Sequence, residues 1–184
     1  MKKISLKSIA LAAMAGVAVL MTASCGNSAN GGGSSSDVIT DSVGSNGKKF
    51  AINETRGFLL CYPDMLTREG NNVSDANSSI TVEYGTCTAE QAADVKAWSE
   101  KAYDDLKAAH PNAKSSSRSS GSTSFVLSIT EDEKHITYDY FIKEGTTDYA
   151  LVTTTVPYGE DKELKEKYGH VWMDMVGGTK WMKK

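Results

Sequence analysis

No apolar run in this sequence has the length that a bilayer-spanning helix requires. Such a helix needs about 20 apolar residues, whereas the apolar run near the N-terminus covers residues 9–22, which is fourteen residues. A permanent transmembrane helix is therefore the weaker interpretation of this run. The chain also lacks a basic run with interleaved aromatic residues, the pattern typical of nucleic-acid binding. Nucleic acid is not expected as a partner.

Motifs of catalysis and phosphate binding are also missing. The sequence contains no G-x-S-x-G, and the glycine run at 31–33 is not followed by the Lys-Ser/Thr of a phosphate loop. His110, His135 and His170 have no neighbouring ligands at the close spacing of a zinc site. His135 follows an acidic turn, residues 131–133, which is better explained as solvated than as a cation site. We therefore expect no catalytic residue, no metal and no cofactor, and a protein that is not an enzyme.

A cryptic hydrolase is the alternative that these absences leave open. A nucleophilic Ser or Cys needs a base in hydrogen-bond reach, and a histidine distant in sequence could supply it. This alternative predicts that His135 or His170 lies beside a Ser or a Cys, with Cys61 and Cys87 as the candidate thiols.

The first twenty-five residues have the features of an export signal. Lys2, Lys3 and Lys7 form a basic segment before the apolar run, and two small residues, Ala23 and Ser24, directly precede a cysteine. The pattern resembles bacterial lipoprotein signals, although Thr22 stands where leucine is usual. The resemblance implies that residues 1–24 are a signal peptide and that Cys25 receives acyl chains such as palmitate. Ordinary cleavage after Ser24, which would release a soluble secreted protein, is the alternative.

The segment that follows the cysteine is too polar to fold by itself. Residues 26–46 are rich in Gly, Ser, Asn and Asp, a composition typical of a flexible coil, with an end-to-end distance of roughly 25 Å. With Cys25 lipidated, residues 25–46 would act as a tether that holds the protein at a membrane of the cell envelope after export.

The remainder of the chain has the size and composition of one domain. Residues 47–184 contain no internal repeat, and their length is typical of a single hydrophobic core. Removal of residues 1–24 takes away three lysines and leaves 17 basic against 23 acidic residues, a net charge of −6. This acidity also argues against nucleic acid, and solubility is its simplest explanation.

Two cysteines lie within this domain. Cys61 follows an apolar run and Cys87 lies just after the next expected strand. Because the domain is expected to be exported, the two can form a disulfide. Two separate thiols are the alternative, since the sequence does not give the distance between their Cα atoms.

The hydrophobic pattern predicts a layered mixture of strands and helices. Strands are expected at 49–53, 58–62, 80–84, 125–129, 136–142 and 149–156, with an edge strand or loop at 113–120. Thr88 and Gln91 form a capping box for a helix whose apolar face carries Val95, Trp98, Ala102, Leu106 and Ala109. A second helix is expected over 161–176, and Trp181 beyond it could cap the core or form a contact surface. The predicted class is α+β, with an antiparallel sheet covered by helices.

Short motifs in this domain resemble PsbP-like domains and the related DcrB-like lipoproteins. The run Gly57 to Pro63 is similar to the Gly-Phe-x-hydrophobic-x-Tyr-Pro opening of that family, and Val156-Pro157-Tyr158 precedes the closing helix. Cys61 and the Ser-rich segment 115–124 depart from the pattern. The resemblance implies an α/β/α sandwich and a role as an accessory or assembly factor of a membrane complex.

These observations predict a lipid-anchored envelope protein without catalytic activity. Its expected partners are the membrane, through the lipid on Cys25, and another envelope component that it binds or stabilises. The alternative is a module for a small ligand, such as a lipid or a signal molecule, in a deep apolar pocket between sheet and helices. A purely structural or inhibitor-like module would instead present a flat exposed patch.

Overall fold

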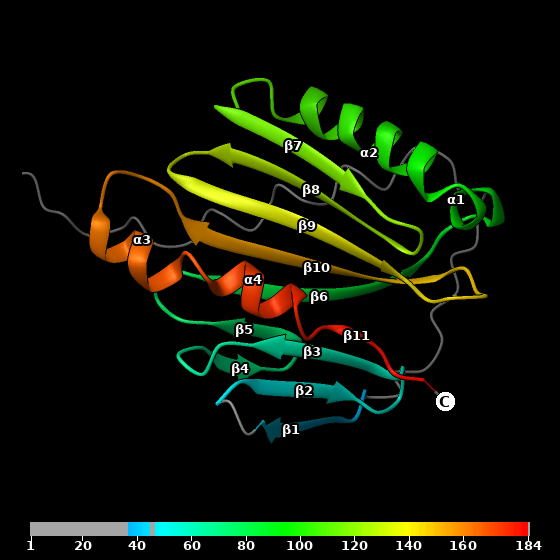
Figure 1. Cartoon of the computed structure of the whole chain (residues 1–184), viewed down its shortest axis with the longest axis horizontal. Helices are drawn as coiled ribbons and strands as arrows, with labels where there is room; N and C mark the ends of the chain where they lie inside the picture. Colours follow the sequence, from blue (N-terminus) through cyan, green and yellow to red (C-terminus); the bar gives the residue numbers. More distant parts are fainter. Residues whose placement is uncertain (1–36, 45–46, 184) are drawn as a thin grey trace, which may run out of the picture. The chain divides into compact units, whose positions relative to one another are not determined.

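The computed structural model describes residues 37–44 and 47–183, in which two antiparallel sheets pack with four helices (Figure 1). Sheet 1 has the spatial order β1 (Ile39–Val43), β2 (Lys49–Asn53), β3 (Phe58–Tyr62) and β11 (Lys180–Trp181). Sheet 2 has the order β4 (Thr67–Glu69), β5 (Asn72–Ser74), β6 (Ser79–Thr86), β10 (Asp148–Pro157), β9 (Lys134–Ile142), β8 (Ser124–Glu131) and β7 (Ser115–Ser120). The helices are α1 (Ala89–Ala93), α2 (Val95–Ala109), α3 (Lys162–Tyr168) and α4 (Val171–Val176).

The predicted α+β class with antiparallel strands agrees with this structure, but the expectation of a single sheet is wrong. The chain leaves sheet 1 after β3, where Pro63 has no N–H to donate to a ladder. The Pro63 carbonyl instead accepts from Leu66 N in a turn. The polar segment that follows forms the β4–β5 hairpin, which joins β6 in sheet 2.

The folded domain begins earlier than the predicted boundary at residue 47. Residues Ile39–Val43, expected to belong to the linker, form β1 and pair along their length with β2. The sequence of this segment does not predict a strand, because four of its five residues are exposed and most are polar. Its pairing comes from the neighbouring strand, and Arg68 binds Asp41 through two hydrogen bonds of 2.6 Å. The predicted signal peptide and Cys25 lie outside the described residues.

Sheet 2 separates two hydrophobic cores. One face packs against α2, and the predicted alternation of apolar residues in β8 and β9 points to this side. This helix core consists of Val95, Leu106, Phe125, Leu127, Ile129, Tyr138, Ile142, Tyr149 and Leu151. In Figure 1, α2 accordingly lies beside β7 and β8.

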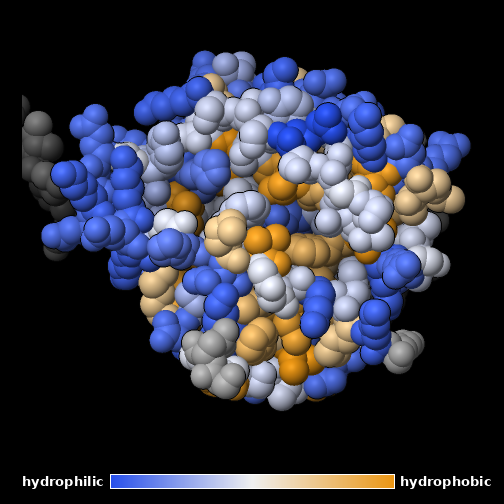
Figure 2. All heavy atoms as spheres, viewed as in Figure 1, coloured by the Kyte–Doolittle hydropathy of each residue, from blue (hydrophilic) through white to orange (hydrophobic). Residues whose placement is uncertain are grey.

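The other face of sheet 2 packs against sheet 1 and the closing helices. This inter-sheet core consists of Ala51, Phe58, Leu60, Tyr62, Leu66, Val73, Ile80, Val82, Ala150, Val152, Tyr168, Val171 and Met175. α4 contacts both β3 and β10 and therefore lies where the two sheets meet. Figure 2 shows hydrophilic residues over the end of the molecule that α3 forms, as expected for a helix with three lysines and two glutamates.

The predicted helices are present with different boundaries. Thr88 and Gln91 form the expected capping box, but they begin the short α1, and Asp94 begins α2 by accepting from Ala97 N. Of the predicted apolar face of α2, only Ala109 is exposed. The predicted helix over 161–176 is divided into α3 and α4 at Gly169, a residue with low helix propensity.

Candidate functional site

The two cysteines of the domain are free thiols, so the candidate disulfide between Cys61 and Cys87 is not formed. Cys61 is fully buried in β3, and a Cβ placed on Gly178 would come within 2.8 Å of its sulfur. Cys87 packs against the helix core instead, and its thiol donates to the Thr147 carbonyl at 3.2 Å. Burial raises the pKa of both thiols, which favours the less nucleophilic protonated form.

The histidines have partners other than the Ser or Cys that the hydrolase alternative predicts. His110 Nδ1 lies 2.6 Å from a Glu131 carboxylate oxygen. His135 Nδ1 lies 2.9 Å from the hydroxyl of Thr130, and burial lowers the pKa of this imidazole. The first contact joins the end of α2 to β8, and the second lies within the β8–β9 hairpin. His170 precedes α4 without donating or accepting a side-chain capping bond.

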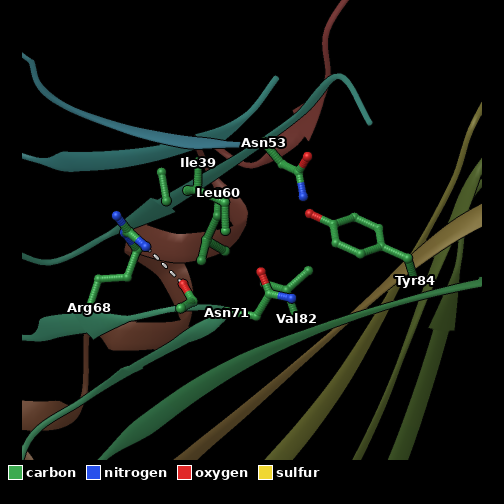
Figure 3. Close-up of a pocket in the computed structure, with 9 residues that line it drawn as sticks. Ile39, Asn53, Leu60, Arg68, Asn71, Val82 and Tyr84 are labelled. Atoms are coloured by element: carbon green, nitrogen blue, oxygen red, sulfur yellow. Dashed lines mark hydrogen bonds between the residues drawn. The ribbon is translucent and has the colours of Figure 1, made fainter. Parts of the chain in front are cut away.

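The core between the two sheets leaves a small cavity beside Tyr84. This cavity, which also adjoins Asn53, Leu60 and Val82, has a volume of about 10 Å³ (Figure 3), which is close to the space of one water molecule. The Asn53 side chain points toward the Tyr84 hydroxyl in this view. A deep apolar pocket for a small molecule, as the ligand-binding alternative requires, is not found at this place.

A larger, open groove lies at the other side of Tyr84. Its volume is about 510 Å³, within the range of ligand sites in proteins, roughly 300 to 1,000 Å³. It is lined by Asp37, Thr55, Arg56, Tyr84, Gly85, Thr86, Lys143, Asp148, Tyr149 and Trp181. These residues come from the segment before β1, the turn between β2 and β3, the end of β6, the turn between β9 and β10, the start of β10, and β11. We refer to this site as the inter-sheet groove.

Trp181 connects the two sheets at this groove. It lies on β11 in sheet 1, and its indole Nε1 donates to the carbonyl of Phe141 in sheet 2 at 2.9 Å. Its ring also packs edge-on against Phe58, with 5.0 Å between the centroids. Of the two roles considered for Trp181 from the sequence, capping the core is therefore confirmed, and the residue lines the groove as well.

Two cations lie over the aromatic rings of the groove. The Arg56 guanidinium is 4.6 Å from the centroid of Tyr84, and the Lys143 ammonium is 5.1 Å from that of Trp181. Both distances are in the range of favourable cation–π contacts. Burial raises the pKa of Tyr84 to about 12, so this side chain is a neutral phenol at physiological pH. The groove thus combines positive charge with a fixed aromatic floor.

The close packing of the aromatic rings that line the groove requires a glycine at position 85. A Cβ at this position would lie 2.6 Å from the ring of Tyr149, which is only 6% exposed and cannot move aside into solvent. We expect Gly85→Ala to displace the Tyr149 ring and to destabilise the protein by about 1–3 kcal/mol, the usual cost of overpacking. Urea unfolding of the variant measures this. Gly159→Ala, at a site with no atom within 4 Å, is the matched control, and equal midpoints would contradict the prediction.

Asp139 is a second unusual residue, and it lies away from the groove. Its side chain is 3% exposed on β9 and accepts two hydrogen bonds, of 2.9 and 3.1 Å, from Nε1 of Trp172 on α4. Burial raises the pKa of this carboxyl to about 7, although the Trp172 bonds act in the opposite direction. Asp139 stands between two tyrosines of an alternating strand, and this position in the sequence is typical of a residue that faces solvent. The pair joins α4 to sheet 2.

The part of the chain that the structure describes has neither a candidate metal-binding cluster nor a membrane-spanning helix. Residues 37–44 and 47–183 contain no cluster of three His, Cys, Asp or Glu side chains that could hold a metal ion. None of the helices described is long and apolar enough to cross a membrane. No family model matches the chain, and no curated protein matches it either. The inter-sheet groove is therefore the candidate functional site on geometric grounds.

Proposed function

We propose that this protein is a lipid-anchored envelope protein that binds or stabilises another envelope component without catalysing a reaction. The observation that carries the proposal is the inter-sheet groove, which is large enough for part of a partner and is lined by two cations and three aromatic rings. Aromatic residues and arginine are enriched in binding interfaces. The groove is open to solvent and therefore accessible to a macromolecule.

The position of Asp37 relates the groove to the predicted anchor. Asp37 is the first described residue, lines the groove and accepts from Arg56 Nε at 3.1 Å. Since Asp37 contacts Arg56 and β1 begins at Ile39, the linker predicted from the sequence shortens to residues 26–36. A coil of this length has an end-to-end distance of about 20 Å. If Cys25 is lipidated, the groove would be held close to the membrane surface, which raises its effective concentration for membrane partners.

The fold type within the α+β class is part of the same proposal. We infer a PsbP-like or DcrB-like domain, supported by the long helix α2 after β6, the meander of β8, β9 and β10, and the closing helices α3 and α4. Accessory and assembly roles in that family agree with a non-catalytic partner-binding function. The small cavity between the sheets disfavours the alternative of an enclosed ligand carrier.

Site-specific photocrosslinking in cells tests the proposed function. A photoreactive amino acid at Thr86, which is exposed in the groove, is expected to capture one envelope component, identified by mass spectrometry. The same group at Ser119, exposed on β7 at the far edge of sheet 2, is the control and should not capture it. Equal capture from both positions would contradict a role of the groove.

The proposed tether predicts that capture from Thr86 depends on the lipid and on the length of the linker. Cys25→Ala is expected to reduce the capture from Thr86 at least tenfold, because the effective concentration at the membrane is lost. Deletion of residues 27–35, which leaves β1 intact, should reduce it as well, whereas replacing them with a Gly/Ser sequence of equal length should not. Capture that survives Cys25→Ala unchanged would exclude tethering as the mechanism.

A further inference from the structure

The two cations of the inter-sheet groove retain unused hydrogen-bond donors. Arg56 Nε is engaged by Asp37, but within the described residues neither terminal nitrogen of this guanidinium makes a hydrogen bond. Lys143 Nζ likewise forms no salt bridge with the described residues, and its contact is the ring of Trp181. A cation–π contact leaves the N–H groups of a cation available to a further partner. The groove therefore presents several charged donors to solvent.

The rings beneath these cations are held in place by the surrounding structure. Tyr84 and Trp181 lie with 6.3 Å between their centroids, and both pack edge-on against Phe58, which is 1% exposed. The bond from Trp181 to the Phe141 carbonyl fixes the second ring further. Since the two rings are neighbours, the cations above them face the same groove. The cation–π contacts with these fixed rings restrict the two side chains, which lowers the entropy lost when an anion binds.

We propose that the groove is an oxyanion site, in which Arg56 and Lys143 bind a carboxylate or phosphate group of the component that the protein recognises. This inference rests on the proposed function and specifies its chemistry. The planar guanidinium can donate two parallel hydrogen bonds to such a group, and the lysine ammonium adds a point charge.

The carboxylate of Asp148 requires the ligand to carry a second polar group next to its oxyanion. This carboxylate lines the same groove and is exposed, without a salt bridge to any described residue. An oxyanion binding next to it would be repelled unless the ligand also carried a donor for this carboxylate. The groove therefore fits a group in which an oxyanion and an ammonium or hydroxyl lie a few bonds apart. Both amino-acid carboxylates and phosphate-containing headgroups have this chemistry.

A titration with small zwitterions tests the proposal. The full chain, purified from membranes in detergent, is titrated with phosphorylethanolamine and with β-alanine, and the indole N–H signal of Trp181 is followed by NMR. At least one of the two is expected to shift this signal saturably in the millimolar range. The stronger of the two identifies phosphate or carboxylate as the source of the anion. Ethanolamine, which has the donor but no anion, should produce no saturable shift.

Lysine variants inside and outside the groove distinguish binding in the groove from a general effect of charge on binding. Lys143→Gln is expected to weaken the binding at least tenfold, and Arg56→Gln should act in the same direction. Lys107→Gln is the control, because Lys107 also lies over an aromatic ring, Tyr103 at 5.2 Å, but on α2 and outside the groove. Unchanged binding in Lys143→Gln, or no saturable shift with either zwitterion, would overturn the proposal.

The failure of this inference is distinguishable from failure of the proposed function. Capture of an envelope component from Thr86, together with no response to either zwitterion, would retain the partner-binding function and exclude oxyanion recognition. Saturable binding that depends on Lys143, together with no captured component, would retain the oxyanion site and exclude the proposed macromolecular partner.

Discussion

Replacing Asp139 with asparagine is expected to stabilise the protein above pH 7 and to remove much of the fall in stability between pH 4 and pH 7. The carboxyl is 3% exposed on β9, and its pKa in the folded protein is about 7. In the unfolded chain an aspartate has a pKa of about 3.9. The folded state therefore binds the proton more tightly than the unfolded state does.

The sign of the effect follows from this difference. Between the two pKa values the folded protein binds more protons than the unfolded chain, so the free energy of unfolding decreases as the pH rises. The stabilisation is complete below about pH 4 and is lost as the pH passes through about 7. Three pKa units correspond to about 4 kcal/mol, which is an upper bound for this group. The asparagine side chain of the variant would be neutral throughout and would still accept from Trp172 Nε1.

Urea unfolding of Asp139→Asn and of the unchanged protein at pH 4, 5, 6, 7 and 8 measures this effect. The difference in the free energy of unfolding should be small at pH 4 and should reach a few kcal/mol in favour of the variant at pH 8. Asp148→Asn, which removes a carboxyl group from an exposed position, is the control. A variant that keeps the original slope, or that is less stable at pH 8, would show that Asp139 is not the titrating group.

Replacing Trp181 with alanine is expected to destabilise the protein by about 3 kcal/mol, toward the lower end of the range for Trp→Ala. The lower end applies because the side chain is half-buried. The substitution removes the packing against Phe58, the hydrogen bond to the Phe141 carbonyl and the ring beneath Lys143. The hydrogen bond connects β11 in sheet 1 to β9 in sheet 2, so its loss should weaken the association of the sheets.

Trp181→Phe separates the packing of this residue from its hydrogen bond. Phenylalanine keeps an aromatic ring against Phe58 but has no N–H to donate, so a cost of about 1 kcal/mol is expected. Denaturant unfolding followed by far-UV circular dichroism compares the two variants. If Trp181→Ala costs less than Trp181→Phe, or less than about 1 kcal/mol, the residue does not hold the sheets together.

Local patterns predicted much of this fold. The alternation of Phe125, Leu127 and Ile129 required one face of a strand to be buried, and that face packs under α2. Gly57 and Gly145 stand between expected strands, where glycine is typical of turns, and both have positive φ, of 74° and 72°. Such features depend on residues that are only a few positions apart in the chain, so the local sequence is enough to predict them.

Features that depend on distant segments were not predictable in this way. β1 is a strand because β2 supplies its hydrogen bonds, and its polar composition alone predicted a linker. Asp139 stands between two tyrosines of an alternating strand, yet it contacts Trp172 on α4, more than thirty residues later, and burial raises its pKa. Neither strand pairing at an edge nor burial by a remote helix leaves a periodic signal in the local sequence.

The sequence by itself determined the α+β class, the antiparallel strands, the turns and the apolar face of α2, because each follows from short-range periodicity and backbone preference. It also determined the expectation of a lipid on Cys25. Only the tertiary structure decided that there are two sheets, that Cys61 and Cys87 stay apart, and that Arg56 and Lys143 meet at one groove. Those two cations belong to turns 87 residues apart, and only the packing of sheet 1 against sheet 2, joined by Trp181, brings both to one groove.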